Sequence, residues 1–286
     1  MLVQSSYGKS RVRLVQVLRR SDRHDLRDLT VAVRFEGHYD ESYVDGDNSS
    51  VLPTDTMKNT VYAFAAQEPV SDPEAFGLRL ARHFLERNSR LTRVRLDFTE
   101  HLWDRIAESG SEHPHAFVRN GSGTRTAVVD AARDAVVVSA GIGDLVILKS
   151  AHSAFDGFPR DAYTTLPETR DRLLATALTA VWQYRGTDLE YAPIWRQVRQ
   201  VLLDVFARHH SESVQHTLYA MGEAVLERVA LVAAIRLTMP NRHHLPVDVS
   251  RFGFENRNEI FVATEEPHGL IEATITRSGS AGTPSF

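Results

Sequence analysis

The stretch VLPTDTMKNT, residues 51–60, is the part of the chain from which its fold and its chemistry are best interpreted. Apolar residues recur here and just beyond at the spacing of one helix face: Met57, Val61, Phe64 and Ala65. This period predicts an amphipathic helix. We expect Thr54 or Asp55 to be its N-cap, because either side chain can accept a hydrogen bond from the first-turn amides. Such a helix start, with Lys58 one turn further on, suits an anionic ligand, although an ordinary capped surface helix has the same features.

Length, charge and composition narrow the class of protein. A chain of 286 residues suits one large domain or two of ordinary size. The formal charge of −4 argues against a nucleic-acid-binding protein, which usually has a basic face. No apolar run approaches the roughly 18 residues of a membrane span, and the N-terminus lacks the apolar core of a signal peptide. The absence of cysteine excludes disulfides and thiolate metal sites and fits a reducing cytoplasm.

The first half of the chain reads as strands and helices in the order ββααββ. Alternating apolar and polar residues predict strands over residues 11–18, 31–36 and 93–98. The polar link between the first two predicts a hairpin. A second helix is expected to start at residues 71–74, where Ser71 and Glu74 have capping-box spacing and Pro73 suits the first turn. Residues 116–119 and 124–129 flank Asn-Gly-Ser-Gly, which predicts another hairpin.

The second half repeats this order. A hairpin is predicted around the glycines of residues 141–144, and helices are predicted over residues 194–206 and 214–225. Further strands are expected at residues 178–184, 231–239 (ending before Pro240), 260–263 and 271–276. The order predicts an α+β fold, with antiparallel sheets covered by helices on one face. We expect domains at 1–132 and 133–286, with a disordered tail at 278–286.

Five stretches, in this order along the chain, resemble the urate oxidase (uricase) family. They are Tyr7-Gly8-Lys9, the VLPTDTMKNT stretch, FDGFPRDAYTTLPETRDR at residues 155–172, Ser213-Val214-Gln215, and MPNRHHLPVD at residues 239–248. The resemblance implies tandem T-fold (tunnelling fold) domains, each an antiparallel sheet with two helices. It also implies a homotetramer in which the sheets close into a barrel and active sites are shared between subunits.

The resemblance implies a reaction and a set of site residues. Family members oxidise urate with O2 to 5-hydroxyisourate and H2O2, with no cofactor and no metal. The residues similar to the family's catalytic proton relay are Lys9, Thr54 and His243. The residues similar to its substrate-binding set are Thr54, Asp55, Phe155, Arg172, Val214, Gln215 and Asn241.

Each substrate-binding residue has an implied role. Phe155 would stack on the purine face, and Arg172 would make a two-pronged contact with its planar fork. The Val214 amide and Gln215 would read the opposite edge, and Asn241 would hold oxygen or water above the ring. Thr54 and Asp55 would hold a urate edge at the helix start.

Ordinary interpretations and other functions remain open from the sequence. Lys9 could be a solvated charge, Phe155 a core residue, and Arg172 one half of a salt bridge with the acidic residues before it. The alternatives are another T-fold enzyme acting on a purine or pterin, with a histidine-bound metal, and a non-catalytic purine-binding tetramer. The chain ends Thr-Pro-Ser-Phe rather than in the family's peroxisomal Ser-x-Leu type signal, so we expect a cytoplasmic protein.

Overall fold

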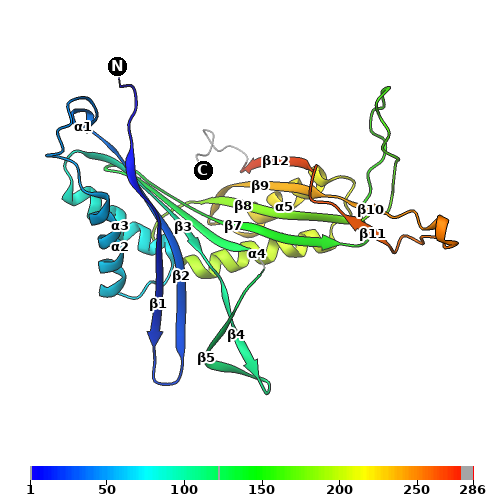
Figure 1. The fold of residues 1–286 in the computed structure, drawn as a ribbon, viewed down its shortest axis with the longest axis horizontal. Helices are drawn as coiled ribbons and strands as arrows, with labels where there is room; N and C mark the ends of the chain where they lie inside the picture. The colour runs from blue at the N-terminus through cyan, green and yellow to red at the C-terminus, as the bar shows by residue number, and fades with distance from the viewer. Residues whose placement is uncertain (1, 122, 278–285) are drawn as a thin grey trace. The chain divides into compact units, whose positions relative to one another are not determined.

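The computed structural model describes residues 2–121, 123–277 and 286 (Figure 1). It divides into two compact units. The first unit comprises Met1–Gly141 and Gln183–Trp195 with Phe286, and the second comprises Ile142–Trp182 and Arg196–Ser285. The division into domains 1–132 and 133–286 stays a prediction. The tail predicted to be disordered falls, except for its last residue, on positions 278–285, outside the described residues.

The sheet of the first unit is antiparallel. Its strands are β1 (Tyr7–Arg19), β2 (His24–Gly37), β3 (Leu91–Glu100) and β6 (Thr124–Ala132), in the order β1-β2-β3-β6. The predicted hairpin of the first two strands is confirmed, and its turn is closed by a hydrogen bond from the Arg20 amide to the Arg23 carbonyl of 3.0 Å. Alternate residues of β2 are fully buried, so one face of this sheet forms the core: Leu29, Val31, Val33 and Phe35.

Helices α1 (Asp40–Val44), α2 (Thr54–Gln67) and α3 (Pro73–Arg87) also belong to the first unit. The helix predicted from the opening stretch is α2, and it buries Met57, Val61 and Ala65. The prediction of its N-cap is wrong, because Pro53 is the N-cap and no side chain among the described residues caps the helix. The Asp55 carboxylate instead accepts hydrogen bonds from Lys58 and Asn59. The first-turn amides of α2 therefore have no side-chain cap.

The start of α3 also differs from the prediction. Asp72 is the N-cap, not Ser71, and Pro73 occupies the first turn. The predicted capping box does not form, because the Glu74 side chain is buried against Arg125. The expected core face of this helix is confirmed by three fully buried side chains, Phe76, Leu80 and Phe84.

Arg125 is the centre of a buried ionic cluster in the first unit. Its guanidinium lies 2.9 Å from Asp72, 2.7 Å from Glu74 and 3.6 Å from Glu100. Burial raises the pKa of Glu74 to about 7, against the attraction of Arg125. Because the folded protein holds this proton more tightly than the unfolded chain does, protonation of Glu74 stabilises the fold. This stabilisation is fully present below pH 4.5, the ordinary pKa, and is lost as the pH rises through about 7.

We expect Arg125→Met to lower the free energy of unfolding by about 3–5 kcal/mol, because it leaves buried carboxylates without their cation. The loss should be larger at pH 8 than at pH 5.5, where Glu74 can take up a proton. Urea unfolding at both pH values measures it. Arg93→Met is the control, since the Arg93 guanidinium is half-exposed and its partner Asp130 also lies 3.7 Å from Arg95. This substitution should cost about 1 kcal/mol or less. Equal losses for the two variants would contradict the assignment.

The hairpin predicted around residues 120–123 is wrong. The strand before this turn, β5 (Ser111–Arg119), pairs with β4 (Trp103–Glu108), which the sequence did not indicate. The strand after the turn is β6, which pairs with β3 in the sheet. The Asn120 amide donates to the Leu102 carbonyl at 3.0 Å and closes the base of the β4–β5 arm. The turn residues therefore connect this arm to the sheet.

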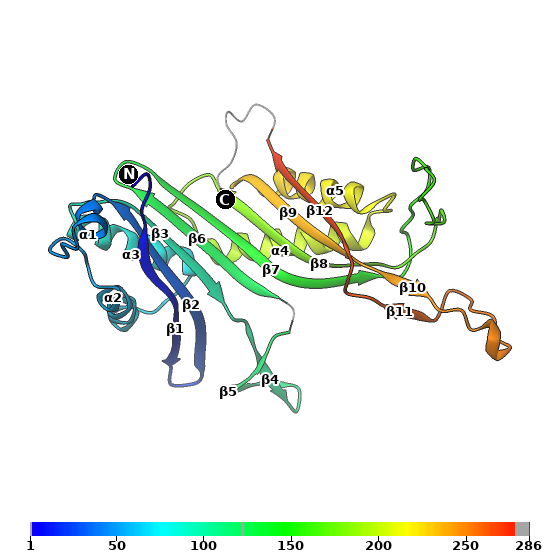
Figure 2. The same cartoon turned by 45° about the horizontal axis from the view of Figure 1, so that its top comes forward.

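The second unit holds most of β7 (Val136–Lys149), β8 (Leu174–Tyr184) and α4 (Tyr191–Arg208). It also holds α5 (Val214–Arg228), β9 (Val232–Arg242), β10 (His244–Pro246), the short helix Ser250–Phe252, β11 (Phe261–Ala263) and β12 (Gly269–Thr276). The strand order is β7-β8-β9-β12, and α5 packs on β9 and β12 (Figure 2). The predicted repeat of ββααββ is thus present in both halves, with α1, the arm strands, the short helix Ser250–Phe252 and β10–β11 as additions.

Two local predictions in this half are wrong. The glycines of residues 141–144 do not form a turn, because β7 runs through them as one strand with Ile142 and Leu145 buried. Strand β9 does not stop at Pro240, which lies opposite Leu270 of β12. The next residue, Asn241, lies opposite Gly269 in the same ladder. The continuation of β9 carries the Asn-Arg-His-His sequence to the end of the sheet.

Among the helices of the described chain, none is both long and apolar enough to cross a membrane.

Candidate active site

A pocket of about 340 Å³ in the second unit brings together four of the predicted site residues, namely Phe155, Arg172, Asn241 and His243. Two of them lie in the long connection between β7 and β8, and two lie at or just beyond the end of β9. Leu166, Leu245 and Phe261 supply apolar walls. The pocket therefore combines a flat apolar surface with a few polar groups, which is the usual composition of a small-molecule site.

Phe155 lines one wall of this pocket, and a second aromatic ring packs against it. Phe155 is held by a pair of backbone hydrogen bonds with Thr169, of 2.7 Å and 3.1 Å. Phe158 stacks on it with ring centroids 4.9 Å apart and an interplanar angle of 15°. Both rings are only half-buried, so Phe155 is not an ordinary core residue. The backbone pairing presents its ring at the pocket.

The Arg172 guanidinium lies 5.1 Å from the centroid of the Phe155 ring. Its Nε atom is buried and has no hydrogen-bond partner within the part of the chain that the structure describes. Burial lowers the pKa of this guanidinium. The alternative interpretation was a salt bridge between Arg172 and the acidic residues before it. Among the described residues Arg172 forms no such pair, whereas the neighbouring Arg170 pairs with Asp156 at 3.0 Å. A partly desolvated guanidinium whose Nε atom lacks a partner among the described residues favours binding of an anion.

His243 and its neighbour His244 both line the pocket. The His244 ring lies with its Nδ1 atom 3.2 Å from the Arg242 carbonyl. The His243 backbone carbonyl accepts hydrogen bonds from the Thr264 amide and hydroxyl, at 2.9 Å and 3.2 Å. For the described residues, no hydrogen bond holds the His243 ring, which leaves both its nitrogens available for proton exchange.

Val214 and Gln215 also lie in the second unit, in the first turn of α5, but they do not line this pocket. The helix is capped by Ser213, whose hydroxyl accepts from the His216 amide at 3.1 Å. Val214 is buried and Gln215 is exposed. The amides of Val214 and Gln215, at the first two positions of the helix, have no intrahelical acceptor and are available to an external one.

The remaining predicted residues lie in the first unit. Lys9, near the start of β1, lines a hollow of about 220 Å³ together with Arg34 and Asp97. Thr54 and Asp55 begin α2. The pKa of Asp55 is lowered, first by its hydrogen bond with Lys58 and in part by the charge of Lys9. Lys9 therefore lies close enough to the start of α2 to act on it electrostatically.

Local packing explains the Tyr7-Gly8-Lys9 motif. A Cβ atom on Gly8 would lie 1.9 Å from the Val33 carbonyl oxygen, so no other residue fits there without a backbone shift. The Tyr7 hydroxyl accepts a hydrogen bond from the Leu52 amide at 3.1 Å. This bond ties the strand that carries Lys9 to the loop that leads into Thr54. Sequence reasoning missed the role of Tyr7 because its partner is far along the chain.

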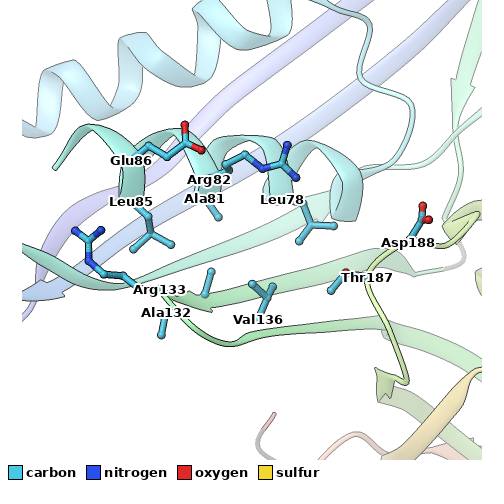
Figure 3. A pocket seen from close by; sticks show the side chains of 11 residues that line it. Leu78, Ala81, Arg82, Leu85, Glu86, Ala132, Arg133, Val136, Thr187 and Asp188 are labelled. Carbon is cyan, nitrogen blue, oxygen red and sulfur yellow. The ribbon is translucent and has the colours of Figure 1, made fainter. Parts of the chain in front are cut away.

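Another hollow, of about 510 Å³, lies in the first unit between α3 and the end of β6 (Figure 3). Leu78 and Leu85 of α3 and Val136 of β7 give it apolar walls on opposite sides, and Arg82, Glu86, Arg133 and Asp188 also line it. Of the described residues, none of the predicted site residues and no aromatic residue lines it. Within the described residues, no group of three or more potential protein ligands is arranged to hold a metal ion.

Known proteins that are similar to this chain over nearly its whole length are uricases. A sequence model of the uricase family matches residues 5–130 and 138–272. The uricase of Arthrobacter globiformis is 45% identical over 280 residues, covering 98% of this chain and 91% of the relative. The uricase of Dictyostelium discoideum is 40% identical over 282 residues, covering 98% of each chain. The crystal structure of the Arthrobacter globiformis enzyme superposes with a TM-score of 0.95 at 44% identity, covering 99% of this chain and 97% of that one. On these grounds the chain is a member of the uricase family.

Proposed function

We propose that this chain oxidises urate with O2 to 5-hydroxyisourate and H2O2, using neither a metal nor an organic cofactor. The observation that carries the proposal is Arg172, a partly buried guanidinium beside the Phe155 ring whose Nε atom has no hydrogen-bond partner among the described residues. Urate at neutral pH is a flat purine anion. Its ring can stack on Phe155 while its carbonyl and ring nitrogen edge meets the planar fork of Arg172.

The proposed reaction consumes urate, O2 and water and forms 5-hydroxyisourate and H2O2. Triplet O2 reacts slowly with closed-shell molecules, but an electron-rich urate anion can pass electrons to it one at a time. The two electrons lost by the ring and two protons convert O2 into H2O2, and water supplies the new hydroxyl group. The protein must therefore remove a proton from bound urate and hold O2 against the ring.

Each polar residue has a part in this scheme. The Lys9 amine draws a proton through the Thr54 hydroxyl, and the His243 ring completes the relay. Asn241, at the end of β9, holds O2 or water above the ring. Gln215 and the Val214 amide bind the purine edge that faces away from Arg172, at the start of α5.

We further propose that the site is completed between subunits of a homotetramer. Lys9 and Thr54 lie in the first unit, whereas Phe155, Arg172 and Gln215 lie in the second. Strands β1 and β12 each stand at the end of the strand order of their own unit. Pairing such edges between subunits satisfies their backbone groups and closes the sheets into a barrel.

The test of the reaction is urate absorbance followed in air-saturated buffer with EDTA, together with a peroxide assay. We expect steady loss of urate and equimolar formation of H2O2. Activity that disappears with the chelator and returns only when a metal ion is added would overturn the cofactor-free proposal and favour a metal-dependent T-fold enzyme.

Arg172→Lys is expected to weaken urate binding by about 1.5–3 kcal/mol, because lysine keeps the charge but loses the planar fork. Binding of a purine analogue that is not oxidised measures this directly. Arg170→Lys is the matched control, since the Arg170 guanidinium is exposed and pairs with Asp156. The affinity of this variant for the analogue should not change. An unaltered affinity in Arg172→Lys would remove Arg172 from the site.

A further inference from the structure

Ser211 lies in the short connection between α4 and α5, which leads into Val214 and Gln215. Its side chain is fully buried. The Ser211 amide donates to the His152 carbonyl at 2.9 Å, and its carbonyl accepts from the Ala154 amide at 2.7 Å. These bonds form a parallel bridge between Ser211 and Ser153. The connection is therefore fixed to the segment that continues directly into Phe155.

The same bridge also holds the start of the β8 segment. The Ser153 carbonyl accepts a hydrogen bond of 2.9 Å from the Arg172 amide. Three segments that are distant in the sequence, those of Ser153, Arg172 and Ser211, are thus joined by backbone hydrogen bonds. Two of these segments carry the groups proposed to hold one face and one edge of the purine.

The Ser211 hydroxyl links this bridge to the first turn of α5. It donates to the Ser213 carbonyl at 2.9 Å. That carbonyl also accepts the Thr217 amide at 3.1 Å, in the first hydrogen bond of the helix. The orientation of the helix start relative to the bridge is therefore set by a side-chain hydrogen bond as well as by the chain itself.

We propose that Ser211 is a positioning residue for purine recognition, which acts by holding the first turn of α5 so that Gln215 meets the purine edge opposite Arg172. This inference rests on the proposed function. A ligand held at two edges needs a fixed separation between the groups that bind them, and small displacements of either group reduce affinity. The backbone bonds of the bridge remain when the hydroxyl is removed, so folding is preserved while the helix start loses its link.

Ser211→Ala is expected to weaken binding of a non-oxidised purine analogue about 3–10-fold, from loss of one hydrogen bond. The KM for urate should rise by a similar factor, while kcat changes less than about twofold. Ser153→Ala is a matched control, because this buried hydroxyl belongs to the same bridge but has no partner among the described residues. The control should change neither constant by more than about twofold.

A double-mutant cycle with Gln215→Ala separates positioning from general destabilisation. If Ser211 acts through Gln215, Ser211→Ala should have a much smaller effect on analogue binding in the Gln215→Ala background than in the parent. The same factor in both backgrounds, or equal effects of Ser211→Ala and Ser153→Ala, would overturn the inference. A parent protein that binds the analogue and oxidises urate, whatever the variants do, leaves the proposed function standing. A parent that does neither refutes both proposals.

Discussion

Lys9→Met is expected to slow urate oxidation by about 10²–10⁴-fold while changing purine binding little. Methionine keeps the length and most of the apolar stem of lysine but removes the nitrogen that accepts a proton. Thr54 alone is a poor base, because a hydroxyl takes up a proton only weakly. Stacking on Phe155 and the contact with Arg172 do not involve Lys9, so affinity should be retained.

The surroundings of Lys9 support this role. Throughout the described residues, its ammonium has neither a hydrogen bond nor an ion pair, although it lies in a hollow with Asp97. Lys58 is different, because its ammonium is paired with Asp55. Lys58→Met is therefore the matched comparison, and we expect it to slow turnover by no more than a few-fold.

Turnover of Lys9→Met within a few-fold of the parent would show that the base lies elsewhere, and His243 would be the first residue to examine.

Periodic patterns predicted the elements of this fold well because they report burial of one face. The alternation around Val31 and Val33 and the helical period of Met57 and Val61 correspond to side chains that are fully buried. Local turn signals were less reliable. The glycines at 141–144 lie inside β7, where burial of Ile142 outweighs the local preference for a turn.

The site residues were predictable only through family resemblance, since a single lysine or arginine has many ordinary uses. The residues that sequence reasoning missed act through partners distant in the chain. The Tyr7 hydroxyl meets the Leu52 amide 45 positions away. Ser211 is bridged to Ser153, and the whole of β8 and α4 lies between these two residues in the sequence. No periodic pattern or short motif encodes such pairs, because they form only when the fold brings the segments together.

Mixing two inactive variants, Thr54→Ala and Arg172→Ala, is expected to restore activity if each site is shared between subunits. In a mixed tetramer, an Arg172→Ala chain supplies an intact Lys9 and Thr54, and a neighbouring Thr54→Ala chain supplies an intact Phe155 and Arg172. With equal amounts and random assembly, about a quarter of the sites should contain two intact halves. The measurement is urate turnover after the two proteins are unfolded together and refolded.

Separate refolding and affinity tags are the controls for the mixing experiment. Each variant refolded alone should stay inactive, and the two refolded separately and then combined should recover activity only as fast as subunits exchange. Mixed tetramers can be verified with a different affinity tag on each variant. If they form and activity does not return, the two halves of each site must come from one chain, because in that arrangement every site in the mixture carries one damaged half. Recovery near a quarter would instead assign Lys9 and Thr54 to one subunit and Arg172 to its neighbour, so that dissociation of the tetramer would abolish activity.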